Sequence, residues 1–519
     1  MSDVPTNKDA ITPVVRNSTD EDYKDGNLKV VEAHILQERT IGIFGAVSLI
    51  VNKIIGSGIF STPATILRLS GSPGMALMCW LIGGVIATSG TLVFLEFGTA
   101  IPRSGGVKNY LERAFSPRLM QSCIYIFYCV FLQVSASNAI TFSSYILVSA
   151  GVESTTWLLR GVAISSAVFA VAVHTVVPRW GRALQDALAA VKIFVLFFII
   201  CCGFAALNGH LRIEKPHNFT NAFEGTSSNG YNIGTAILSV IFSFNGYDNV
   251  NAVLSEVKNP QRTLRIALPL AMGVITVLYL LANLAAVPKE EFITAQVTIA
   301  ATLFANLFGE SAGTKVLPVL VALSALGHLL GVAFTIPRLI QELAKDGVLP
   351  FSNFMMENRP FKTPIYALAL HLGVTILFIC APPAGDAFNF VVALSSYPTT
   401  IMYLALTIGL VKLRLVKKEQ WSAPFSAPWI IIGIYLAGNI FLAVMPLVRP
   451  PGGKGSTSLP YWLTSVVALA ILSLGIVYYV LRFVLVPRIF GYRHVTWQKE
   501  LSDGSTVTRF KRVGQQTIQ

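Results

Sequence analysis

Charged residues stand inside long apolar stretches of this chain. Placing a charge in such surroundings costs free energy, so each of these residues is expected to have a partner or a function. Lys192 lies well inside the apolar run 183–206, and a charge at such a depth costs about 2.5 to 3.5 kcal/mol on membrane-insertion scales. Lys53 and Asp248 each lie beside a glycine-containing segment, and we predict an ion pair between them. For Lys192 the alternative is a lysine whose ammonium reaches back to the membrane surface.

Two short segments interrupt apolar runs with residues that form helices poorly. One reads Ile54-Ile55-Gly56-Ser57-Gly58-Ile59-Phe60, and the other reads Phe242-Ser243-Phe244-Asn245-Gly246-Tyr247-Asp248-Asn249. In hydrocarbon, unwound backbone persists only where protein, ligand or trapped water satisfies its N–H and C=O groups. Glycines that merely let helices pack closely are the alternative. A second break at a corresponding position of the chain favours a binding site.

The two segments together could bind a zwitterion. A half-helix that starts near Ile59 presents free N–H groups and a positive dipole end to a carboxylate, and the Ser57 hydroxyl is a further donor. Carbonyls freed in the second segment could accept hydrogen bonds from an ammonium. The candidate substrate-binding residues are Ile54, Ile55, Gly56, Ser57, Gly58, Phe242, Ser243, Asn245 and Asp248.

Membrane-spanning helices must position these residues. The chain has 519 residues, of which 53% are hydrophobic and 13% charged, too apolar for a water-soluble fold of this size. Apolar stretches of about 20 residues, the length that crosses a bilayer, recur at 41–69, 74–101, 119–149, 157–177, 183–206, 231–255, 264–287, 314–337, 364–381, 387–411, 427–448 and 461–486. We therefore expect an all-α polytopic membrane protein with twelve transmembrane helices. The first and sixth are discontinuous, as in a five-plus-five inverted repeat.

The loop charges predict where the tails lie. Most Lys and Arg residues between the spans fall in the alternate connections that begin at Ile101, so the positive-inside bias places both termini in the cytoplasm. This explains much of the net charge of +13 without a nucleic-acid partner. The predicted organisation is an N-terminal tail over 1–40, a twelve-helix domain over 41–486 and a C-terminal tail over 487–519.

Smaller features complete the prediction. The polar first 40 residues contain no cleavable signal peptide, and residues 102–115 predict a short interfacial helix. Lys8, Lys24 and Lys29 flank an acidic stretch and could serve ubiquitin-ligase adaptors; a solvated disordered tail is the alternative.

No group of residues predicts catalysis, a metal or a cofactor. Glu96, His174, His328 and His371 have no second titratable group at a spacing that would build an acid–base pair or a metal site. We expect them to be packing or interfacial residues, and we expect no enzyme activity.

Several motifs resemble those of the amino acid/polyamine/organocation transporters, in particular their L-type branch. They are Ile55-Gly56-Ser57-Gly58-Ile59-Phe60, the loop 102–106, the break 245–248 followed by 256–260, and the segment 338–350. The similarity covers about residues 41–486. Further blocks at 51–53, 96–102, 108–112, 217–226 and 350–354 resemble the methionine permeases of fungal plasma membranes.

The resemblance implies uptake of neutral L-amino acids, above all methionine and also cysteine, across the plasma membrane by proton symport with alternating access. It also implies that Phe242 is an aromatic gate and that Lys192 occupies a sodium position, so that both serve coupling and gating. Because Lys53 lies beside the first break, we expect it to take part in coupling as well. Lys53 and Asn245 depart from the family pattern and are expected to affect selectivity. An uncoupled or exchange transporter of the same fold, and an amino-acid sensor, remain alternatives.

Overall fold

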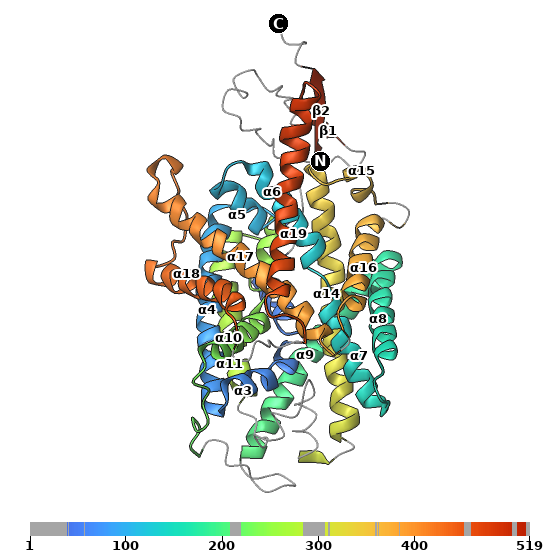
Figure 1. Cartoon of the computed structure of the whole chain (residues 1–519), viewed down its shortest axis with the longest axis vertical. Helices are drawn as coiled ribbons and strands as arrows, with labels where there is room; N and C mark the ends of the chain where they lie inside the picture. Colours follow the sequence, from blue (N-terminus) through green and yellow to red (C-terminus); the bar gives the residue numbers. More distant parts are fainter. Residues whose placement is uncertain are drawn as a thin grey trace, which may run out of the picture.

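The structure is a computed structural model of the chain, and many of its long helices run along the long axis of the molecule, whereas others lie across it (Figure 1). It describes residues 39, 41–56, 58–207, 220–283, 307–309, 312–358, 361, 363–383, 385–450, 458–500 and 506–514. The predicted donor Ser57 and the lysines of the N-terminal tail lie outside the described residues.

Within these residues, nine helical segments are long and apolar enough to cross a membrane. They are α4 (Pro73–Ala100), α6 (Arg118–Phe127) with η2 (Tyr128–Leu132) and α7 (Ala136–Ala150), α8 (Thr156–Val176), α9 (Pro178–Leu207), α11 (Pro260–Ala282), η4 (Ala312–Val316) with α14 (Leu317–Lys345), α17 (Ala387–Leu415), α18 (Trp429–Val444) with η6 (Met445–Leu447), and α19 (Leu463–Tyr479) with η8 (Val480–Leu485) and α20 (Val486–Ile489). Three shorter apolar helices are α1 (Ile43–Ile54), α10 (Gly230–Phe244) and α16 (Ile365–Cys380). All of them fall at positions where the apolar stretches predicted helices.

Both predicted interruptions are present. After α1 ends at Ile54, the chain resumes as α2 (Gly58–Ser61) and α3 (Pro63–Ser70). After α10, residues 245–248 form a turn, and the chain continues as the 3-10 helix η3 (Asn249–Glu256). Gly246 in this turn has a φ of 123°, and a Cβ added there would lie 2.5 Å from Lys53 Cγ. Only glycine satisfies both the backbone angle and the close approach.

The predicted interfacial helix is α5 (Val107–Ala114), and much of it is buried. Lys108 Nζ donates to Asp346 Oδ2 at 2.5 Å and lies 3.3 Å from Glu112 Oε1. Burial alone would lower the pKa of Lys108, but the carboxylates of Asp346 and Glu112 outweigh it and raise that pKa above its usual range. Asp346 caps α14, so this ion pair ties α5 to the end of a spanning helix.

The C-terminal tail contains structure that the sequence did not predict. Strands β1 (Tyr492–Glu500) and β2 (Thr506–Gly514) pair antiparallel. The hairpin lies beyond the bundle, at the same end as α5 and the short helix α15 (Ser352–Met355) (Figure 1). The 3-10 helix η5 (Lys417–Glu419) follows α17.

Glu96 is a member of a buried charge cluster rather than an interfacial residue. Its side chain is fully buried, and it accepts hydrogen bonds from both Nε and Nη2 of Arg414. Trp421 Nε1 at 3.0 Å and the backbone N–H of Ala427 at 2.9 Å are further donors. The cluster joins α4, α17 and the segment that leads to α18.

Removing one charge of this pair should destabilise the bundle. Glu96→Gln leaves the Arg414 guanidinium buried without a counter-ion, and the loss of one partner of a buried pair costs about 3 to 5 kcal/mol. We expect a lower thermal unfolding temperature for the protein in detergent. The double variant Glu96→Met with Arg414→Met, which removes both charges, should be more stable than Glu96→Gln; a single variant as stable as the wild type would contradict a structural role for the pair.

Candidate functional site

The two interrupted helices meet where their backbones are unwound. A Cβ added at Gly58 would lie 2.8 Å from Ser243 Cα, so the start of α2 packs directly on the end of α10. Thr62 Oγ1 donates to the Gly58 carbonyl at 2.9 Å and lies 3.0 Å from Ser243 Oγ. The structure thus brings together two segments that lie far apart in the sequence.

Tyr279 of α11 satisfies backbone carbonyls from both breaks. Its hydroxyl lies 3.0 Å from the Ile54 carbonyl and 3.2 Å from the Ser243 carbonyl, so its single proton is shared between the ends of α1 and α10. The ring is fully buried and packs edge-on against Trp80, with ring centroids 5.6 Å apart. Tyr279 was not a predicted site residue, because nothing in the sequence around it marks it out.

Most of the predicted binding residues line one cavity of about 120 Å³. Those in its wall are Ile54, Gly56, Gly58, Phe242, Ser243, Asn245 and Asp248, joined by Lys53. Ile55 is fully buried and is not part of the wall. One water molecule needs a cavity volume of roughly 10 to 15 Å³. A cavity several times larger than this suits a small molecule.

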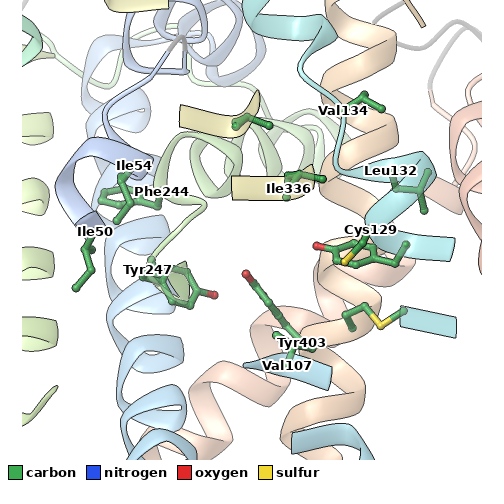
Figure 2. Packing of buried hydrophobic residues seen from close by; sticks show 14 of the residues in the cluster. Ile50, Ile54, Val107, Cys129, Leu132, Val134, Phe244, Tyr247, Ile336 and Tyr403 are labelled. Atoms are coloured by element: carbon green, nitrogen blue, oxygen red, sulfur yellow. The ribbon is translucent and has the colours of Figure 1, made fainter. Parts of the chain in front are cut away.

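The other side of this cavity is rich in apolar and aromatic residues. Figure 2 shows Cys129, Leu132, Val134 and Ile336 on one side of the close-up and Ile54 on the other, and all five line the cavity. Tyr403 is another wall residue, and its hydroxyl lies 3.5 Å from Asn245 Oδ1. The cavity therefore has one side made of the broken helices and another made largely of α6, η2, α14 and α17, where apolar and aromatic side chains stand beside polar ones such as Gln133 and Ser395.

A larger cavity of about 990 Å³ leads from this site toward α5. The two cavities share Lys53, Asn249, Ala252, His328, Val332, Thr335 and Leu339. The larger one reaches the exposed residues Arg118, Arg182 and Gln420. Solvent therefore approaches the breaks from the end of the bundle where α5 lies.

Lys192 points into the bundle, toward the helix that carries the first break. Its side chain is fully buried, and Nζ donates to Asn52 Oδ1 at 3.0 Å and to the Asn52 carbonyl at 3.3 Å. A Cβ added at Gly327 of α14 would lie 3.1 Å from Lys192 Cε. This geometry disagrees with a lysine that reaches back to the membrane surface. Lys192 instead links α9 to the last turn of α1 beside α14.

Lys53 and Asp248 line the same small cavity, but the predicted ion pair is absent. In the part of the chain that the structure describes, no salt bridge within 4.0 Å joins them. The stem of Lys53 packs against Gly246, two residues before Asp248. The prediction of a direct pair was wrong, although both charges do belong to the site.

His328 was expected to be a packing residue, and the structure places it in the walls of both cavities. Its Nδ1 is buried and has no hydrogen-bond partner among the described residues. A Cβ added at Gly56 would lie 2.5 Å from this nitrogen, so the imidazole sits directly against the first break. In the sequence, an isolated histidine in an apolar helix carries no sign of this position.

Comparison with known proteins agrees with this architecture. Residues 41–471 match the sequence model of a family described as amino acid permease. The chain is 40% identical to the high-affinity methionine permease of Saccharomyces cerevisiae, over 93% of this chain and 85% of that protein. It is 32% identical to the low-affinity methionine permease of the same yeast, over 91% and 88%, and 30% identical to the human Asc-type amino acid transporter 1, over 82% and 81%. The chain belongs to the amino acid permease family, whose members are membrane transporters and not enzymes.

Proposed function

We propose that this protein is a plasma-membrane secondary transporter that imports neutral L-amino acids, most of all methionine. The names of the yeast relatives support methionine, and the Asc-type relative supports amino-acid transport more broadly. The full proposal includes twelve transmembrane helices in a five-plus-five inverted repeat, with both termini in the cytoplasm. The nine long apolar helices and three shorter ones support this count.

One observation carries the proposal: the N-terminus of α2 and the C-terminal end of α10 face one small cavity. The first N–H groups of α2 form an anion site for the substrate carboxylate, and Gly56 and Gly58 keep side chains out of its way. The ammonium group binds carbonyls at the ends of α1 and α10. Each carbonyl has two lone pairs, so those of Ile54 and Ser243 can accept from the ammonium while Tyr279 stays bound.

The opposite wall suits a thioether side chain. Tyr125, Cys129, Leu132 and Met402 line it, and sulfur makes favourable contacts with aromatic rings. Asn245 adds one amide at the boundary between the polar and apolar walls, which is compatible with cysteine as a second substrate.

Protons are the proposed coupling ion, with Lys192 as the group that carries the charge beside Asn52. The substrate joins the two breaks, Phe242 closes over it from outside, and the bundle then opens to the other side. Since the large cavity ends at α5, which the loop charges place in the cytoplasm, the structure corresponds in this proposal to a state open to the inside.

Uptake by the purified protein in proteoliposomes tests coupling. With an inward proton gradient, labelled methionine should accumulate above its external concentration, and a protonophore should abolish the accumulation. Unlabelled neutral amino acids should compete. Equal accumulation with and without the gradient would favour the uncoupled alternative, and uptake that requires internal amino acid would favour exchange.

Lys192→Ala should abolish gradient-driven uptake while the protein still folds and reaches the membrane. The variant removes the ammonium that is hydrogen bonded to Asn52, and with it a link between α9 and the end of α1. Lys417→Ala, an exposed lysine on η5, serves as the matched control and should transport normally. Wild-type uptake by Lys192→Ala would remove Lys192 from the mechanism.

His328→Ala should raise the KM for methionine more than it lowers the maximal rate. Loss of one hydrogen bond to a bound polar ligand costs about 1 to 1.5 kcal/mol, which corresponds to roughly a tenfold change in affinity. His328→Gln retains a polar group and should recover part of the loss. If KM and the competition profile are unchanged in both variants, His328 is a packing residue.

A further inference from the structure

The C-terminal hairpin packs beside the end of the last helix. Phe483 of η8 contacts His494 of β1 and Phe510 of β2, with ring centroids 5.5 and 5.2 Å apart. Phe483 lies more than one turn before the helix ends at Ile489. The chain therefore reverses after Gly491, whose φ is 62°, and the hairpin runs back along the helix toward the bundle (Figure 1).

This contact occupies one face of the hairpin and leaves the other exposed. Side chains alternate between the two faces of a strand, and the pairing of Thr496 with Phe510 places His494 and Phe510 on the same face. Trp497 and Lys511 belong to the opposite face, because Val495 pairs with Lys511. Trp497 is 46% exposed, and Lys511 is exposed as well.

Exposed apolar and basic residues also stand at the end of the helix, directly before β1 in the sequence. Ile489 and Phe490 are 66% and 72% exposed, and Arg488 beside them is exposed too. We call this surface the C-terminal patch. It consists of Arg488, Ile489, Phe490, Arg493, Trp497 and Lys511.

The composition and place of the C-terminal patch fit a membrane surface. Aromatic rings collect where a bilayer meets water, and basic residues just past a span are attracted to anionic headgroups. Leu481 and Leu485, which precede the patch on the same helix, are exposed apolar residues of the last long apolar segment. The surface nearest to the patch is therefore the bilayer that this segment crosses.

We propose that the C-terminal patch docks on anionic phospholipid headgroups at the end of the last helix. The apolar rings of Phe490 and Trp497 enter the interfacial region, and the charges of Arg488 and Lys511 face lipid phosphates and carboxylates. The hairpin holds these groups together, because its other face is fixed to the helix by Phe483. This inference does not depend on which amino acid the protein transports.

Hydrogen exchange of the full-length protein in lipid nanodiscs tests the proposal. Amides of β1 and β2 should exchange more slowly when phosphatidylserine replaces part of the phosphatidylcholine, and added salt should weaken this effect. Each basic residue near an anionic surface is worth about a fivefold change in binding. In the double variant Arg488→Gln with Lys511→Gln, the slowing of amide exchange that anionic lipid causes should therefore be roughly 10- to 30-fold smaller than in the wild type.

A matched variant separates this local effect from net charge. Lys417→Gln with Lys418→Gln removes two exposed charges from η5 and should leave the protection of the hairpin unchanged. Trp497→Ser should reduce protection without any change in charge. Equal exchange in neutral and anionic nanodiscs would overturn the proposal. Equal protection by inorganic phosphate in neutral nanodiscs would overturn it as well, because it would indicate a site for a free anion.

Discussion

The hydroxyl of Tyr279 lies between two backbone carbonyls, those of Ile54 and Ser243, and the shape of the site depends on this contact. A helix that stops inside the membrane leaves carbonyls without partners, at several kcal/mol for each one that stays unpaired. Here one side chain from a third helix serves the ends of both broken helices. The same contact joins the two ends, so one side chain links the backbone of both broken helices at the small cavity.

Close packing of small residues accompanies this hydrogen bonding. Gly58 lies against Ser243, Gly246 against the stem of Lys53, and Gly327 against Lys192. At each place a methyl group would push apart two elements that must touch. The glycines of the breaks therefore have two roles: they let the backbone unwind, and they let the neighbouring chain come close enough to satisfy what unwinding exposes.

The buried charges divide into two kinds. Glu96 and Arg414 neutralise each other and are surrounded by donors and acceptors, as expected of a structural pair. Among the described residues Lys192 hydrogen bonds to a neutral partner, Asn52, and Lys53 and Asp248 share a cavity without a salt bridge between them. A buried charge without a counter-ion is costly to the fold, and this is why Lys192 is the group to which we assign proton coupling.

The sequence by itself determined the positions of the helices and of both breaks, because hydrophobic length and helix-breaking residues are properties of short segments. It also identified Lys192, since an isolated charge in an apolar run is visible without a structure. Only the tertiary structure decided the partners: Asn52 for Lys192, Arg414 for Glu96, the place of His328 beside Gly56, and the role of Tyr279. It also showed that Lys53 turns toward Gly246 rather than pairing with Asp248. Such contacts join residues from different helices, and the rotation and depth of each helix, which no local pattern encodes, determine which side chains meet.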